Sequence, residues 1–335
     1  MAHADVALPV ARRGLLRRAA DEFIRRREAS ILVVALALGA YFWITKPVFL
    51  SRGNIITISQ YVAPWAILAA GEVLLLVSGE IDLSVGNVYA LAPFLMHFAI
   101  DYYHVPPVAA VILVLVIGAF IGLINGLITV ALHVPSFITT LGTLFALNGI
   151  TLITSHAFPA LIPAKAVGMG RWLGGAPWAE IIWAILIVAV FQTVLTNTRW
   201  GLHTIAVGGN LLGASEAGVA VSRVKIGNFM IASTLGALTG ILEAFRVGSI
   251  DPLAGGTEVM FFAVASCVIG GTALAGGSGT IVGAFFGALV LGILHDGFNL
   301  IGISAFAFSL ILGVAILAVM TLNVYLARLR RAGRV

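Results

Sequence analysis

The chain has 335 residues, of which 60% are hydrophobic and only 10% carry a charged side chain. Soluble domains have about 25% charged residues, so the composition excludes a soluble protein and indicates an integral membrane protein. The formal net charge of +5 does not indicate nucleic-acid binding, because arginines beside apolar segments act as signals of membrane topology. A single cysteine, Cys267, excludes an internal disulfide.

Residues 1–29 are rich in arginine and contain no short apolar stretch that ends in a small-residue cleavage site. We therefore expect a basic cytoplasmic tail and no cleaved signal peptide. Apolar residues stand among the arginines and leave two interpretations open: a basic amphipathic helix on the membrane surface, or a disordered tail. The residues concerned are Leu15, Leu16, Phe23 and Ile24.

A transmembrane helix needs roughly 20 apolar residues. Apolar runs bounded by charges, prolines or glycine clusters predict spans at 30–45, 55–78, 84–100, 108–131, 137–155, 178–196, 227–246, 258–272, 280–299 and 304–325. The alternative for one of the glycine-rich segments is a re-entrant loop. The sequence thus predicts an all-α integral membrane protein with about ten transmembrane helices.

The positive residues predict the orientation, because Lys and Arg concentrate on the cytoplasmic side. With a cytoplasmic N-terminus, 14 of the 19 Lys and Arg residues fall inside. The five outside are Lys46, Arg52, Lys165, Arg171 and Arg246. We expect a multi-pass protein of the cytoplasmic (inner) membrane, with both termini and the polar segment 197–226 in the cytoplasm.

Two segments of the first half are echoed in the second. The run from Gly79 to Gly86 (GEIDLSVG) is followed 169 residues later by GSIDPLAG, and GAFIG at Gly118 is followed 165 residues later by GAFFG. Five spans per half would place the halves upside down relative to each other, as in many transporters. We expect a first half at 30–196, a cytoplasmic loop at 197–226, a second half at 227–325 and a basic cytoplasmic tail at 326–335.

Motif searches exclude several kinds of chemistry. The sequence has no G-x-x-x-x-G-K-[ST] motif, so the chain cannot bind ATP through a P-loop. It has no H-E-x-x-H or C-x-x-C spacing, so we expect no metal site and no cofactor on this chain. The run Gly276-Gly277-Ser278-Gly279 favours close helix packing; the alternative is a rhomboid-like intramembrane serine protease with His295 as the base.

Charged residues inside apolar spans need an explanation, since each costs about 2.5–3.5 kcal/mol to insert. The clearest cases are Glu72, Glu243, His295 and Asp296. Two interpretations remain open: hydrogen bonds between helices that serve packing, or a polar path for a substrate. Asp82, directly before an apolar run, is expected to cap the next helix, because a carboxylate there accepts backbone N–H groups.

Four segments resemble the membrane permease subunits of ABC importers for sugars of the ribose, xylose and galactose type. They are GEIDLSVG at 79–86, VPSFITTLGT at 134–143, AVGGN at 206–210 with the residues up to Lys225, and IGGT with GGSGT at 269–280. Leu211-Leu212-Gly213 replaces more polar residues of the family, and Glu80 stands where Gly is frequent.

This resemblance implies the ABC importer permease fold, with alternating access powered by separate ATPase subunits that bind ATP and Mg. It implies a second permease copy or paralogue and an extracytoplasmic sugar-binding protein as partners, with a pentose or polyol as the favoured cargo. The chain itself would not be catalytic. The implied coupling residues are Gly208, Gly209, Asn210, Ala214, Ala217 and Gly218, and the signature turn contains Glu80, Asp82 and Ser84.

The candidate residues of the translocation path are Gln60, Glu72, Asn87, Asn125, Asn148 and Glu243. Sugars would need several weak hydrogen bonds there, since tight binding would hinder release. An ion-gradient transporter of a small polar solute is the alternative function, based on the repeat and the carboxylates within the spans.

Overall fold

The computed structural model describes residues 27–304 and, beyond them, residues 307, 309–311, 313, 314, 317 and 321. The helices of this part are α2 (Arg27–Thr45), α3 (Arg52–Val77), α4 (Val85–Asp101), α5 (Pro107–Ala131), α6 (Ser136–Ser155), α7 (Val167–Gly170), α8 (Ala179–Asn197), α9 (Arg199–Gly209), α10 (Leu211–Glu216), α11 (Val221–Val247), α12 (Gly256–Ile269) and α13 (Ile281–Leu300). The short elements are η1 (Pro47–Leu50), β1 (Ala160–Leu161), η2 (Ala164–Ala166), η3 (Arg171–Gly175) and β2 (Ser249–Ile250). Strands β1 and β2 pair antiparallel, with Ala160 opposite Ile250.

Among the described residues, seven helices are long and apolar enough to cross a membrane: α2, α3, α5, α6, α8, α11 and α13. Helices α4 and α12 are shorter, with 17 and 14 residues. Each span predicted before residue 304 coincides with a helix, so an all-α membrane protein is confirmed. The predicted span 304–325 and the two basic tails lie largely outside the described residues.

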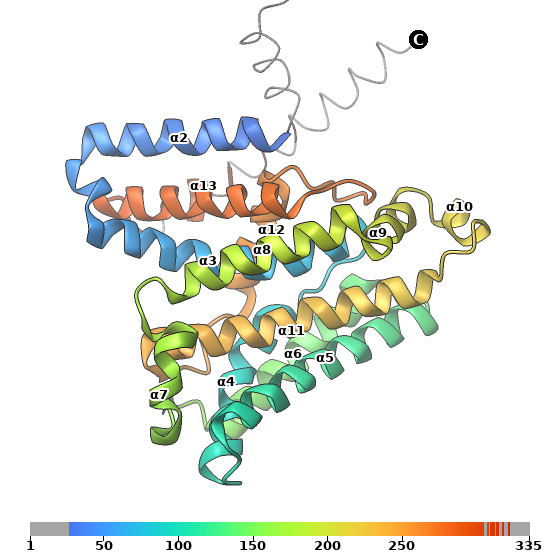
Figure 1. Cartoon of the computed structure of the whole chain (residues 1–335), viewed down its shortest axis with the longest axis horizontal. Coiled ribbons are helices and arrows are strands. Elements are labelled where there is room, and N and C mark those ends of the chain that lie inside the picture. The colour runs from blue at the N-terminus through green and yellow to red at the C-terminus, as the bar shows by residue number, and fades with distance from the viewer. Residues whose placement is uncertain are drawn as a thin grey trace, which may run out of the picture.

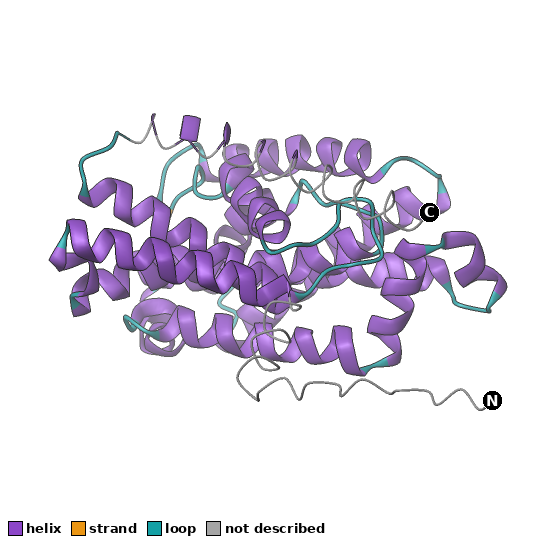
Figure 2. Ribbon diagram, turned by 90° about the horizontal axis from the view of Figure 1, so that it is seen from above, coloured by secondary structure: helices purple, strands orange, loops and turns teal. Residues whose placement is uncertain are grey.

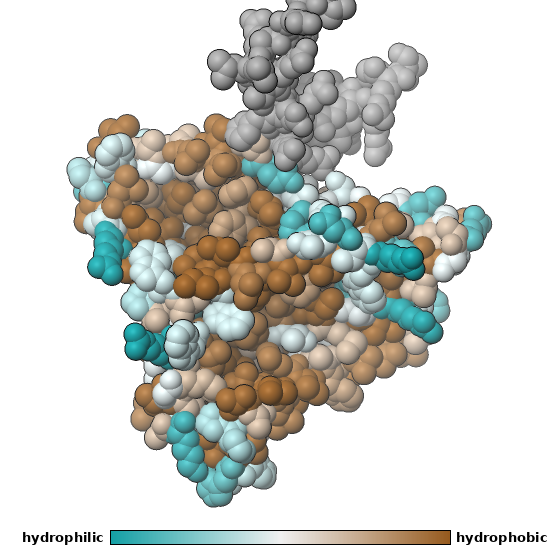
Figure 3. Space-filling model, in the orientation of Figure 1, coloured by the Kyte–Doolittle hydropathy of each residue, from teal (hydrophilic) through white to brown (hydrophobic). Residues whose placement is uncertain are grey.

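Most helices follow the long axis of the molecule (Figures 1 and 2). Helices α9 and α10 lie at one end, here called the α10 end, and α7 lies at the other, the α7 end. On the face that Figure 3 shows, apolar side chains cover most of the surface between the ends, while hydrophilic residues collect near both of them. This distribution fits a helical bundle that crosses a bilayer, with each end in contact with water.

Helix α3 forms the centre of the bundle. Every residue from Val62 to Val77 is buried, and α8, α11, α12 and α13 all pack against this helix. Helix α11 runs beside α3 in the opposite direction (Figure 1), so Gly71 of α3 lies against Ala232 and Leu75 packs with Phe229. Helix α3 is therefore covered by other helices along most of its length, as expected for the central helix of a bundle.

Glycines allow two pairs of helices to approach closely. Gly118, Gly122 and Gly126 form one face of α5, and a Cβ added to Gly122 would lie only 2.3 Å from the carbonyl oxygen of Phe229 on α11. On α13, a Cβ added to Gly287 would lie 2.1 Å from the carbonyl oxygen of Ser266 on α12. Small residues bring membrane helices together in this way, so the echoed glycine segments both serve packing.

The segment 197–226 is not a simple polar loop. It contains α9 and α10, and α11 begins at Val221, six residues earlier than the span predicted at 227. The reason is that Arg223 and Lys225 lie in the first two turns of α11, so an apolar-run criterion excludes them although they are helical. The region therefore folds as two short helices joined to a long one.

Candidate functional site

A buried polar cluster lies where α3, α5 and α11 meet the turn that leads into α4. Asp82 of this turn accepts hydrogen bonds from the hydroxyl of Ser84 at 2.6 Å and from the hydroxyl of Ser233 at 3.3 Å. The amide of Asn125 lies 3.4 Å from a carboxylate oxygen of Asp82, and its oxygen accepts from Thr143 at 2.6 Å. Asp82 and Asn125 are completely buried, so the centre of the cluster is shielded from solvent.

Glu72 of α3 is the second carboxylate of this cluster. One of its oxygens lies 3.5 Å from the backbone N–H of Asp82, and the other, Oε1, has no hydrogen-bond partner among the described residues. The whole side chain is buried. In the described part of the chain no group of three or more His, Cys, Asp or Glu side chains could hold a metal ion, so the pair is a polar centre without metal-site geometry.

Asp82 also positions the start of α4. Its Oδ1 accepts the backbone N–H of Ser84 at 2.8 Å, an Asx-type turn immediately ahead of the first helical residue, Val85. A carboxylate at this place also interacts favourably with the positive end of the helix dipole. The N-cap position of α4 is Ser84, and no described side chain caps it. Asp82, expected to be the cap, stands two residues earlier and has four donor contacts around its carboxylate.

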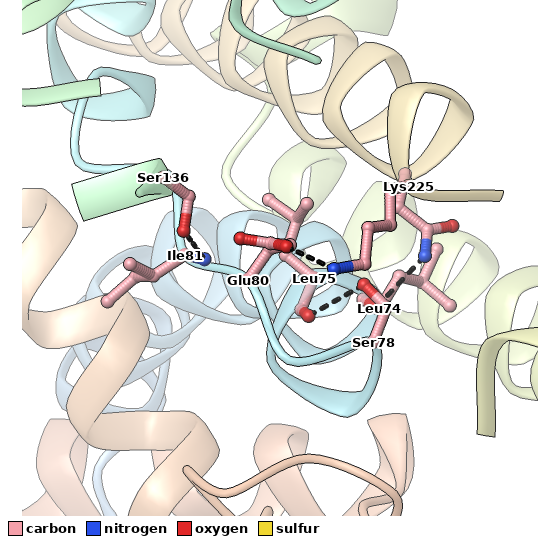
Figure 4. Close-up of polar contacts among 8 residues, drawn as sticks. Leu74, Leu75, Ser78, Glu80, Ile81, Ser136 and Lys225 are labelled. Carbon is pink, nitrogen blue, oxygen red and sulfur yellow. Dashed lines mark hydrogen bonds and ion pairs between the residues drawn. The ribbon is translucent and has the colours of Figure 1, made fainter. Parts of the chain in front are cut away.

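The signature turn is joined to two other helices (Figure 4). The ammonium group of Lys225, near the start of α11, lies 2.5 Å from a carboxylate oxygen of Glu80. The next residue, Ile81, donates its backbone N–H to the hydroxyl of Ser136, the first residue of α6, at 3.3 Å. Both charged side chains are mostly buried, with exposures of 16% and 11%. The turn is therefore joined directly to the beginnings of α11 and α6.

The predicted coupling residues form a compact structure at the α10 end. Asn210 accepts the backbone N–H of Gly213 at 3.0 Å and so caps α10. Ala214 is buried in a small cluster with Val207 of α9 and Val224 of α11. Gly209, Ala217 and Gly218 are exposed, and Gly218 has φ +81°, which suits glycine. Helix α10 thus stands at the surface with one anchored face.

Helix α9 fixes this structure to the core. A Cβ added to Gly208 would lie 1.8 Å from the carbonyl oxygen of Val77, the last residue of α3. The same carbonyl accepts the backbone N–H of Gly277 at 2.8 Å. The segment 276–279 is a loop ahead of α13 and not part of a helix pair, whereas the sequence predicts close helix packing there; Gly276 and Gly277, with φ +86° and +73°, lie against the backbone of α9. Ser278 lies before α13, whereas His295 lies 14 residues beyond Ile281, the first residue of that helix. This separation is about 21 Å along a helix. The alternative of a serine protease with a Ser278/His295 dyad is therefore wrong.

The six candidate path residues do not form one group. Glu72 and Asn125 meet in the buried cluster, and Asn87 donates to the carbonyl oxygen of Leu144 at 2.8 Å. Gln60 and Asn148 are half-buried at other places in the bundle. Hydrogen bonding within the bundle accounts for the contacts of Asn87 and Asn125, whereas their role in a substrate path stays a prediction.

Glu243 belongs to a separate charged group near the α7 end. Arg246, one turn further along α11, contacts the carboxylate of Glu243 and also that of Glu180 on α8, at 3.2 Å. Glu180 is almost fully buried, with 4% exposure. Sequence reasoning missed Glu180, Lys225, Ser136 and Ser233 as partners, because only the fold brings these distant positions together.

A model of the family described as the branched-chain amino acid transport system / permease component matches residues 54–320. The chain belongs to this family of permease components. It is 40% identical over 315 residues to a xylose/arabinose import permease of Sulfolobus acidocaldarius, covering 91% of this chain and 87% of that protein. Against a ribose import permease of Escherichia coli K12 the identity is 34%, covering 87% and 91%.

A third relative, a probable ABC transporter permease of Escherichia coli K12, is 34% identical and covers 92% of this chain and 93% of that protein. No solved structure matches the chain. The resemblance to permeases of ABC sugar importers, based on four sequence segments, is thus confirmed. An ion-gradient mechanism is not favoured by these relatives.

Proposed function

We propose that this chain is the transmembrane permease subunit of an ATP-binding-cassette importer that carries a sugar across the cytoplasmic membrane. The observation that carries the proposal is the full-length similarity to import permeases named for xylose, arabinose and ribose. A pentose is the favoured cargo, since both named relatives import pentoses. In this function the chain supplies the path, and separate ATPase subunits bind ATP and Mg and supply the energy.

We further propose ten transmembrane helices in two inverted halves, at 30–196 and 227–325. Six of the ten predicted spans lie in the first half and four in the second, so the division at 197–226 does not give the five spans per half expected from the sequence. Three features support the inverted arrangement. Helices α3 and α11 run antiparallel through the centre (Figure 1), each is followed by an I-D turn, and each turn leads into a short helix, α4 or α12. Discontinuous helices in corresponding places of two halves are a common mark of the binding region in transporters.

The α10 end is assigned to the cytoplasm. The five positive residues predicted outside all lie on segments at or near the α7 end, whereas Arg199, Arg223 and Lys225 lie on α9 and the start of α11 at the α10 end. Lys and Arg accumulate on the cytoplasmic side of membrane proteins. Both termini are then cytoplasmic, and α7 and the β1–β2 pair face the extracytoplasmic sugar-binding protein.

Force from the ATPase would enter through α10 and reach the signature turn in three steps. Helix α10 is exposed for docking on one face and buried through Ala214 on the other. Ala214 contacts Val224 of α11. The next residue, Lys225, forms the ion pair with Glu80. Glu80 lies in the turn that precedes α4, so a displacement of α10 is passed to the short helix α4. The predicted coupling residues Gly208 to Gly218 fit this role.

The complete transporter would contain two permease chains, either two copies or a paralogous pair, with ATPase subunits at the α10 end. Reconstitution in liposomes tests the proposal. Vesicles that contain the permease, its ATPase and its binding protein should accumulate a pentose only when ATP is supplied on the ATPase side. Sugar uptake by the permease alone, without ATP, would contradict the proposal, and so would ATP hydrolysis by the purified chain alone.

A further inference from the structure

A small cavity lies between α4, α11 and the turn that joins β2 to α12. Its volume is about 130 Å³, enough for roughly four waters at about 30 Å³ each and well below the roughly 300–1,000 Å³ of sites for drug-sized ligands. Its polar lining consists of Tyr89 of α4, Glu243 of α11, Ser249 of β2 and Asp251 of the turn. The rest of the lining is small or apolar: Ala90, Pro93, Gly240, Ala244, Val247, Ile250 and Ala254. The cavity lies toward the α7 end and is separate from the buried cluster of Asp82.

The polar groups of the cavity are held in place by contacts outside it. Arg246 fixes the carboxylate of Glu243 through two donors. Asp251 accepts the backbone N–H of Leu253 at 2.9 Å, which pins the turn. Ser249 is paired with Leu161 in the β1–β2 ladder. Pre-organised acceptors of this kind bind a ligand without a large ordering cost.

The chemistry of the lining selects a neutral ligand with several hydroxyl groups. Two carboxylates accept hydrogen bonds from O–H donors, and the phenol of Tyr89 offers an aromatic body with a polar tip. An anionic ligand is disfavoured, because both charged lining residues are acidic. A simple cation is also a poor match, since the positively charged guanidinium of Arg246 lies against Glu243. The cavity size admits a molecule no larger than about one sugar ring.

We propose that this cavity is a binding site for a single neutral monosaccharide of pentose size, reached from the α7 end. The inference rests on the proposed function, since it gives the imported sugar a place in the chain. Its polar ligands are Glu243, Asp251 and Ser249, with Tyr89 as the aromatic wall. Of these, only Glu243 is evident from the sequence as a charge within a span.

Site-directed labelling tests the site in the complete transporter. Cys267 is the single native cysteine and is fully buried, so a polar maleimide should label only an introduced thiol. Ser249→Cys places a thiol in the cavity. Ser155→Cys, at the end of α6, is the matched control with a similar partial exposure outside the cavity. With xylose, arabinose or ribose at about ten times its Kd, labelling of Ser249→Cys should slow about tenfold, because only the unliganded fraction reacts.

The outcomes separate the site from the function. Equal labelling of Ser249→Cys with and without each sugar, in a complex that still imports that sugar with ATP, would overturn the site and leave the function intact. Protection of Ser155→Cys to the same degree would also overturn it, since that result indicates a global change. Loss of protection when Glu243→Gln is added supports direct contact. A complex that imports no sugar at all would instead contradict the proposed function.

Discussion

Gly86, in the first turn of α4, lies directly against Gly256, the first residue of α12: a Cβ added to Gly86 would be 1.9 Å from the carbonyl oxygen of Gly256. Val85, the preceding residue, contacts Gly236 in the middle of α11. The two short helices therefore begin next to each other at mid-depth of the bundle. Backbone meets backbone there, with no room for a side chain on Gly86.

Gly86→Ala should destabilise the protein by about 1–3 kcal/mol, the usual cost of overpacking a tight core. The matched control is Gly142→Ala in α6, where nothing lies within 4 Å of an added Cβ; this change should be neutral or slightly stabilising, because alanine favours helix. Thermal unfolding in detergent measures both. Equal stability of the two variants would mean that α4 and α12 do not meet as described.

Breaking the ion pair between Lys225 and Glu80 should uncouple ATP hydrolysis from transport. Glu80→Gln or Lys225→Met removes a contact between a largely buried charge pair, with an expected cost of about 2 kcal/mol. The ratio of sugar imported to ATP hydrolysed is the measurement. The charge-swapped pair Glu80→Lys with Lys225→Glu should recover part of that ratio; if each single variant couples normally, the pair carries no movement.

A charged residue at Ala214 should also uncouple the transporter. The side chain of Ala214 is buried against Val207 and Val224, so Ala214→Glu forces α10 away from α11 while the spans remain folded. Ala217→Glu is the control, because Ala217 is exposed one turn away. Its effect should be confined to any direct contact with the ATPase. We expect Ala214→Glu to retain binding of the ATPase and to lose sugar transport.

Gly218→Ala tests the turn between α10 and α11 without adding charge. Its φ of +81° lies in the region where a non-glycine residue costs about 1–2 kcal/mol. Nothing lies within 4 Å of an added Cβ, so the cost is purely conformational. The variant should reduce the rate of sugar transport while the thermal unfolding temperature changes little, because the strain is confined to the junction between α10 and α11. Wild-type coupling in this variant would show that the junction tolerates the change.

The two buried carboxylates should respond differently to amide substitution. The carboxylate of Asp82 accepts from four donor contacts, and in Asp82→Asn its new –NH₂ group would face some of these donors. The unsatisfied groups should lower the free energy of unfolding by about 1–3 kcal/mol. Glu72→Gln should cost less, since one oxygen of Glu72 has no partner among the described residues. Thermal unfolding of both variants gives the comparison. A larger loss for Glu72→Gln would reverse the assigned roles.

The sequence predicts the helices well and their contacts poorly. Apolar runs locate each described span, because about 20 apolar residues in a row have few alternatives to a membrane helix. The apolar pattern predicts too late a start for α11, because Arg223 and Lys225 interrupt the pattern but not the helix. Asp82 at the head of α4 was predictable from local sequence. Its contact with Ser233 was not, because 151 residues separate the two positions.

The glycine face of α5 has a mechanical consequence. Gly118, Gly122 and Gly126 bring α5 onto the backbone of α11 along about two turns of helix. Along this face the backbone of α5 approaches the backbone of α11, so the contact is close and leaves little room for one helix to shift against the other. We expect α5 and α11 to move together as one rigid unit. A displacement of α11 is therefore expected to involve α5 as well.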